Sequence, residues 1–211
     1  MVRRYGLDPR TVFALRPMHP AVGLAVLIGI PAAYLTGIGL SALVNTYLFP
    51  VPQSVLEAFG EALLGDEMPV WQLIFFLCVM PGILEELAFR GVLLHGLRKT
   101  WRPVGVCLAV GGIFGLFHVD LFRLIPTAYL GVIFAAVVLL TGSIFPAMLW
   151  HFGNNALGLV PVRMGWVTEE TVLPQWAFAI AFVALLVVFW VIWKVSTPYP
   201  DLKKKRPDAF V

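Results

Sequence analysis

A small set of side chains suited to hydrolytic chemistry lies within long apolar stretches of this sequence. The set holds two carboxylates, one guanidinium, two imidazoles and one amide. A charged side chain near the centre of a bilayer costs about 2.5–3.5 kcal/mol to insert, so such residues persist where a function or a fold requires them. They are Glu85, Glu86, Arg90, His118, His151 and Asn155.

The segment 85–90 predicts one ion pair and one separate carboxylate. On a helix, Glu86 and Arg90 stand at positions i and i+4, so they share a face and can pair. Glu85 is turned about 100° from that face, which makes it the less obvious partner of the arginine. A carboxyl group in a low-dielectric cavity is suited to act as a general base or acid near neutral pH. We therefore expect Glu86 to be structural and Glu85 to be reactive, although both acids balancing one arginine remains an alternative.

Two further segments carry imidazole groups at helical spacing. Phe114 and His118 are one turn apart, so the phenyl ring can pack on the imidazole. His151 and Asn155 likewise share a face and form a donor pair for an oxyanion, a carbonyl or a metal-bound water. Taken alone, His118 is more simply explained as an interfacial histidine. The pair His151 and Asn155, taken alone, is as well explained by hydrogen bonds between helices. The polar residues on the three helices are expected at compatible depths in the membrane, which favours one shared cavity.

Composition places these residues in a membrane protein. Hydrophobic residues make up 60% of the chain and charged residues 13%, and the mean hydropathy is +0.88. A soluble domain has about 25% charged residues. A soluble enzyme, a disordered protein and a disulfide scaffold are therefore poor fits, and both cysteines lie in apolar runs.

The apolar runs predict an all-α polytopic membrane protein with about six transmembrane helices around a polar catalytic cavity. We expect the second span to be broken at Pro81-Gly82, and the third and fifth are more polar than the others. An amphipathic surface helix is expected within residues 50–69. The six spans are Ala21–Leu48, Val70–Leu97, Val104–His118, Leu124–Leu140, Phe145–Val160 and Trp176–Lys194.

Basic residues predict the orientation. They occur in the N-terminal arm (1–20), in the loop 97–103 and in the tail (195–211), whereas the loop 49–69 is acidic. By the positive-inside rule both termini face the cytoplasm, in the cell (inner) membrane. The arm and the basic tail flank a single transmembrane domain, 21–194, whose motif core is about 70–160. The basic flanks contact lipid headgroups, and no motif indicates a nucleic-acid partner.

The ordered motifs EELAFR (85–90), FGLFH (114–118) and HFGNN (151–155) resemble the signature of the CPBP family. This family contains the CAAX proteases and bacteriocin-processing enzymes, also called Abi proteins, and its pattern is EExxxR, FxxxH and HxxxN on successive membrane helices. The resemblance covers about residues 70–160. It implies an intramembrane endopeptidase that acts on membrane-associated peptides or lipidated, prenylated (CaaX-type) proteins.

The resemblance also implies roles for individual residues. Glu85 would activate water with help from His118, while His151 and Asn155 would stabilise the oxyanion. Glu86, Arg90 and Phe114 would support the site. No HExxH motif is present, and we favour metal-independent glutamate chemistry with no cofactor. Zinc is the alternative, because three protein ligands and a water form a catalytic zinc site; the ligands would be Glu85, His118 and His151.

Two other classes of function remain open. Some members of the family are linked to bacteriocin immunity or partner binding, so a non-catalytic membrane scaffold is one alternative. A small proton-coupled transporter is the other, since buried ionisable residues also relay protons. Against the transporter, the sequence has no internal inverted repeat. Family members also occur beside transport permeases, so a permease is a possible partner.

Overall fold

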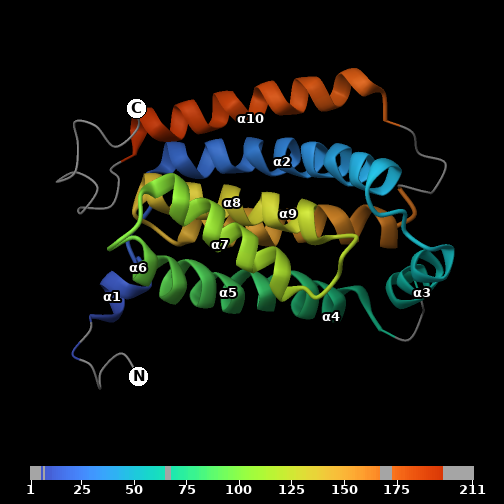
Figure 1. Cartoon of the computed structure of the whole chain (residues 1–211), viewed down its shortest axis with the longest axis horizontal. Coiled ribbons are helices and arrows are strands. Elements are labelled where there is room, and N and C mark those ends of the chain that lie inside the picture. Colours follow the sequence, from blue (N-terminus) through green and yellow to red (C-terminus); the bar gives the residue numbers. More distant parts are fainter. Residues whose placement is uncertain (1–5, 7, 65–67, 167–172, 197–211) are drawn as a thin grey trace.

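The computed structural model describes residues 6, 8–64, 68–166 and 173–196, and within these ranges every regular element is a helix. The helices form an elongated bundle in which the long ones run side by side (Figure 1). The chain has the all-α fold of a polytopic membrane protein.

Four of the six predicted spans are long and apolar enough to cross a bilayer. They are α2 (Pro20–Tyr47), the helix Val70–Leu97, α8 (Leu124–Thr141) and α10 (Gln175–Val195). The third, α7 (Pro103–Phe117), has 15 residues, a length of about 22 Å against a hydrocarbon core of about 30 Å. The fifth, α9 (Phe145–Arg163), has 19 residues, and its apolar run is interrupted by polar residues: His151, Asn154 and Asn155.

The prediction that Pro81-Gly82 breaks the second span is wrong. Residues 70–97 form one continuous helix of 28 residues, composed of α4 (Val70–Ile74), η2 (Phe75–Val79), α5 (Met80–Glu86), η3 (Leu87–Leu93) and α6 (Leu94–Leu97). The two η segments are π-helical, with wider turns than an α-helix. The helix absorbs the proline by widening the turn before it, so the chain continues through Gly82.

Glycine residues allow α7 and α8 to pack closely against each other. A Cβ atom added at Gly115 would lie 2.6 Å from the carbonyl oxygen of Leu124, and one added at Gly131 would lie 2.8 Å from the Cα of Gly111. Both distances are far below van der Waals contact. The backbones of α7 and α8 can therefore approach this closely only because glycine occupies these positions.

Helix α9 lies in the interior of the bundle. Its Trp150 is fully buried and packs over Gly29 of α2, where a Cβ would come within 2.7 Å of the indole ring. On another side, a Cβ at Gly82 of α5 would contact the backbone of α9 at Phe152 and Met148, at 3.4 and 3.5 Å. Helices α2 and α5 thus hold α9 on two sides, which places His151 in the core.

The N-terminal arm packs on one end of the bundle. It contains the short helix α1 (Pro9–Val12). The Ile144 N–H donates to the carbonyl of Ala14 at 3.1 Å, and the Ser143 hydroxyl donates to the carbonyl of Arg16 at 2.6 Å. Helix α10 ends at this same end of the bundle, whereas the predicted surface helix is present as α3 (Gln53–Leu64) at the other (Figure 1).

Candidate active site

The predicted pair between Glu86 and Arg90 is present and fully buried. Arg90 Nη1 donates to Glu86 Oε1 at 2.8 Å, and neither side chain is exposed. The second nitrogen, Nη2, donates to the carbonyl oxygen of Gly131 at 2.8 Å. Helix α8 comes near enough to accept this bond at a glycine, the same glycine that packs against α7. Arg90 therefore links the Val70–Leu97 helix to α8.

Aromatic rings enclose the guanidinium of Arg90. Its central carbon lies 4.5 Å from the ring centroid of Phe114 and 5.2 Å from that of Phe134. Both distances fall within the range of cation–π attraction. The predicted supporting residue Phe114 thus contacts the arginine as well as His118. Phe134 was not anticipated, because nothing in its apolar stretch marks it before the helices are packed.

Glu86 also holds His151, a contact between helices that the sequence did not reveal. His151 Nδ1 lies 2.8 Å from Glu86 Oε1, the oxygen that also accepts from Arg90. A carboxylate paired with arginine accepts hydrogen bonds, so Nδ1 carries the hydrogen and donates it. The imidazole also stacks on Phe134, with ring centroids 5.1 Å apart. Its orientation is fixed, and Nε2 faces away from Glu86.

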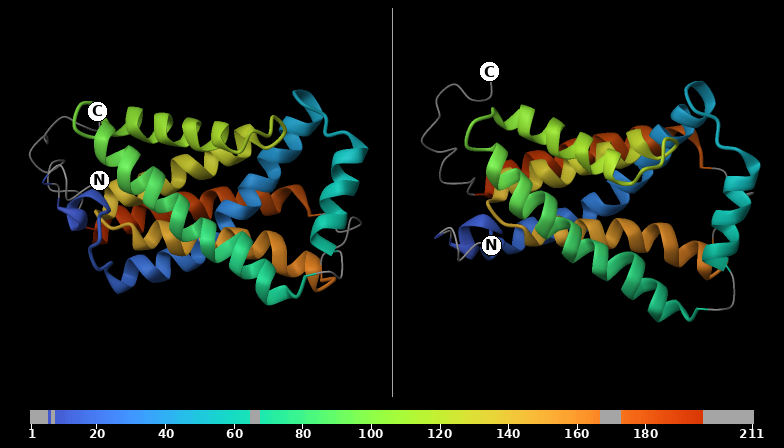
Figure 2. Two further views of the ribbon diagram at one scale, coloured as in Figure 1. Left: turned by 90° about the horizontal axis from the view of Figure 1, so that it is seen from below. Right: turned by 60° about the horizontal axis from the view of Figure 1, so that its bottom comes forward.

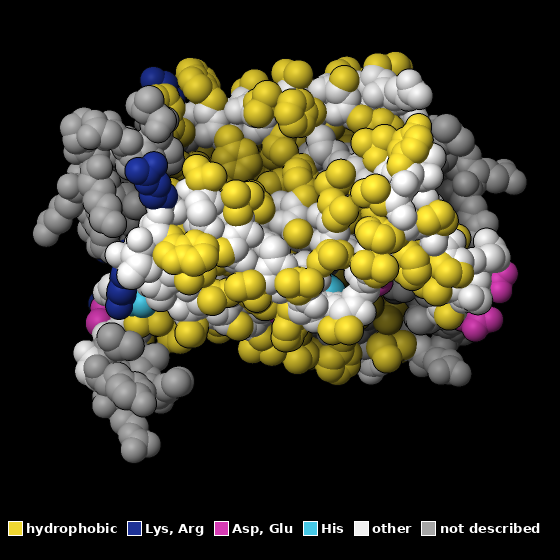
Figure 3. Space-filling model, viewed as in Figure 1, with side chains coloured by type: hydrophobic (Ala, Val, Ile, Leu, Met, Phe, Trp, Pro, Cys, Tyr) yellow, Lys and Arg dark blue, Asp and Glu magenta, His cyan; other side chains and the backbone are white. Residues whose placement is uncertain are grey.

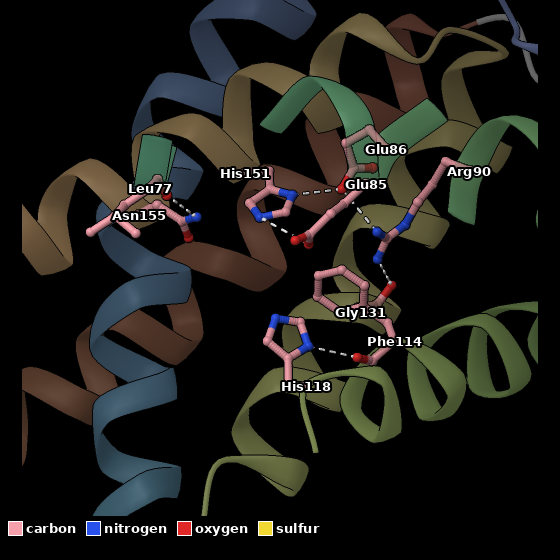
Figure 4. A network of polar contacts seen from close by, with 9 residues as sticks. All are labelled: Leu77, Glu85, Glu86, Arg90, Phe114, His118, Gly131, His151 and Asn155. Atoms are coloured by element: carbon pink, nitrogen blue, oxygen red, sulfur yellow. Dashed lines mark hydrogen bonds and ion pairs between the residues drawn. The ribbon is translucent and has the colours of Figure 1, made fainter. Parts of the chain in front are cut away.

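Glu85 lies on the free side of the imidazole. Its Oε2 is 3.9 Å from His151 Nε2, too far for a direct hydrogen bond but suited to a shared third group. Within the described residues this oxygen has no hydrogen-bond partner, and the side chain is 24% exposed. Glu85 and Glu86 thus face different ring nitrogens of His151, Glu85 the Nε2 and Glu86 the Nδ1 (Figure 4).

His118 comes from the neighbouring helix α7 and caps its end. Its Nδ1 lies 2.8 Å from the carbonyl oxygen of Phe114, which can only accept, so Nδ1 donates and Nε2 is left with its lone pair or a second proton. Its ring packs edge-on against Phe114, with centroids 4.9 Å apart, as predicted. In Figure 4 the one contact drawn for His118 is with Phe114, and none joins it to Glu85 or His151.

Asn155 lies to one side of this group. Its Nδ2 donates to the carbonyl oxygen of Leu77 at 2.9 Å, so the amide is held against the Val70–Leu97 helix and does not face His118 (Figure 4). The preceding residue, Asn154, is buried. Pro81, four residues after Leu77, has no N–H to donate to the Leu77 carbonyl. This proline is the feature of the sequence that indicates the contact.

The site opens on the apolar side surface of the bundle. The helix 70–97 and α7 meet where α6 leads into α7 and diverge toward the other end (Figure 2). On this face, histidine and acidic atoms are visible among hydrophobic side chains (Figure 3). Large apolar residues exposed on these two helices include Ile83, Leu84, Ile113, Leu116 and Phe117. In a membrane this face meets lipid, and the Glu85 side chain is 24% exposed.

The three predicted zinc ligands do not gather into a metal site in this arrangement. Among the residues that the structure describes, no group of three His, Cys, Asp or Glu side chains is placed to share one ion. Both imidazoles are held through Nδ1, that of His118 by the Phe114 carbonyl and that of His151 by Glu86, so neither bond occupies Nε2.

A comparison with protein families adds an independent observation. The family model "Rce1-like: Type II CAAX prenyl endopeptidase Rce1-like" matches residues 67–157. This part of the chain is similar to the Rce1-like family. The matched segment includes all three motifs and runs from the helix 70–97 into α9. The family supports an intramembrane protease in general terms. No curated protein and no solved structure matches the chain significantly.

Proposed function

We propose that this protein is an intramembrane endopeptidase in which Glu85 activates the attacking water. The observation that carries the proposal is the position of the Glu85 side chain, which is partly exposed and places Oε2 3.9 Å from His151 Nε2. Glu86 is fully buried and is engaged by Arg90 and His151. Two adjacent carboxylates in such different surroundings suit two different tasks.

These positions support the following reaction. Glu85 takes a proton from water, and the water oxygen forms a bond to the carbonyl carbon of the scissile peptide. His151, protonated and supported through Nδ1 by Glu86, donates from Nε2 to the developing oxyanion, and Asn155 contributes an amide N–H. His118 Nε2 helps to hold the water. The C–N bond then breaks, and Glu85 returns its proton to the leaving amine.

The surroundings of the site indicate the class of substrate. The apolar side chains of α5 and α7 around the opening face lipid, so a substrate approaches from within the membrane. Peptides of membrane-associated proteins and prenylated CaaX-type proteins have the required apolar segment or anchor. The Rce1-like family match favours the same substrates. A transport permease beside this chain remains a prediction from the sequence.

Peptide cleavage by purified protein tests the proposal. We expect Glu85→Gln to lower kcat about 10²- to 10⁴-fold, the usual contribution of a general base. The panel includes a prenylated CaaX peptide, and every sample is measured with and without a strong chelator. Glu57→Gln is the matched control, because Glu57 is an exposed glutamate on α3.

The outcomes separate the alternatives. Loss in Glu85→Gln with no effect of chelator supports the glutamate mechanism. Loss of wild-type activity with chelator, restored by zinc, contradicts it and supports a metalloprotease. A wild type that cleaves no peptide in the panel favours the non-catalytic scaffold or the transporter.

A further inference from the structure

Pro81 stands at a position that determines the direction of a backbone carbonyl. In an α-helix the Leu77 carbonyl would accept from the N–H of residue 81, and proline has none. A proline ring inside a helix also clashes with the carbonyl four residues before it and displaces that group. Leu77 lies in the π-helical segment η2, directly before α5. Its carbonyl is therefore turned out of the ordinary hydrogen-bond ladder.

The displaced carbonyl meets Asn155 of α9. The Nδ2 of Asn155 donates to the Leu77 oxygen at 2.9 Å. The two helices are in contact at this point, since a Cβ at Gly82 of α5 would lie 3.4 Å from the backbone nitrogen of Phe152 in α9. Pro81 thus leaves the acceptor without an α-helical donor at a place where α9 is in reach.

An asparagine amide has two N–H bonds. One points to Leu77, which fixes the plane of the amide and leaves the other N–H in a defined direction. We infer that Pro81 is a positioning residue: by turning the Leu77 carbonyl toward α9 it orients the Asn155 amide for the oxyanion. This inference rests on the proposed function, because it requires Asn155 to donate to the substrate.

The variant Pro81→Ala tests it. Alanine restores an N–H that draws the Leu77 carbonyl back into the helix and releases Asn155. We expect kcat to fall on the order of 10- to 100-fold with KM unchanged, as for a misplaced reacting group. Combined with Asn155→Ala, Pro81→Ala should add no further loss, since both remove the same contact. Pro31→Ala is the control: Pro31 also lies inside a spanning helix, α2, and is exposed.

A second readout does not depend on activity. The chain has three asparagines, Asn45, Asn154 and Asn155, so protein labelled with ¹⁵N-asparagine in lipid nanodiscs gives few side-chain amide signals. Absence of a signal in Asn155→Ala identifies that of Asn155. We expect it to shift in Pro81→Ala and to stay in place in Pro31→Ala.

The failures are distinguishable. Asn155→Ala with full activity contradicts the oxyanion role in the proposed function, and the inference fails with it. An inactive Asn155→Ala beside a fully active Pro81→Ala overturns the positioning role of Pro81 alone. An Asn155 signal that does not move in Pro81→Ala also overturns that role, whatever the kinetics.

Discussion

Glu86 is the residue on which the arrangement of the site depends most. One of its oxygens accepts from Arg90 and from His151, so a single carboxylate joins the helix 70–97 to α9, and through the arginine to α8. Its pairing with Arg90 was predictable from a spacing of four residues on one helix. Its bond to His151 was not, because 65 residues separate the two and only packing brings them together.

Glu86→Gln and Glu85→Gln should therefore fail in different ways. The first leaves the fully buried Arg90 without its counter-charge, which we expect to cost about 3–5 kcal/mol of stability. The second removes a partly exposed carboxylate with no direct hydrogen bond at Oε2 among the described residues, so folding should be nearly unchanged. Thermal unfolding in detergent measures the difference. Equal unfolding temperatures for the two variants would contradict the division of roles.

At the scale of elements, the sequence predicted the helices well and their junctions less well. The observed bounds of α2, α7, α8 and α10 agree with the apolar runs to within one residue at each end. Apolar runs are local, so the sequence carries them directly. The continuation of the helix through Pro81-Gly82 was missed, because proline ordinarily ends or kinks a helix and apolar runs do not reveal the wider π-helical turn before it.

The close packing of α7 on α8 should be sensitive to a single methyl group. Gly115→Ala would place its Cβ 2.6 Å from the backbone oxygen of Leu124 and push the helices apart three residues before His118. We expect lower thermal stability and lower cleavage. The neighbouring control is Gly112→Ala, where a Cβ meets no atom within 4 Å; alanine there should gain up to about 1 kcal/mol of helix stability. Similar behaviour of the two variants would argue against the packing explanation.

At the scale of the whole molecule, charge is distributed unequally between the two ends. Figure 3 shows Lys and Arg at the end that holds the α6–α7 connection and acidic side chains at the end near α3. The prediction of cytoplasmic termini depends on this asymmetry. It also depends on the basic tail, most of which (197–211) lies outside the described residues, as do residues 1–5 of the arm.

Reporter fusions test the orientation. A fluorescent protein fused after Val211 should fold and fluoresce in the cytoplasm, whereas a periplasmic phosphatase fused within α3 should be active. Basic residues near the span ends are retained inside, which gives this outcome. The reciprocal fusions, phosphatase at the C-terminus and fluorescent protein in α3, should be silent. Activity of the C-terminal phosphatase would reverse the assigned orientation.

The lateral opening beside Glu85 has a consequence for how the protein meets its substrates. A site entered from the hydrocarbon draws on molecules that diffuse in two dimensions, so its rate follows the mole fraction of substrate among the lipids. The volume of surrounding water then has little influence, and added lipid acts as a diluent. Discrimination begins with partitioning, because a peptide that does not enter the bilayer never competes for the carboxylate.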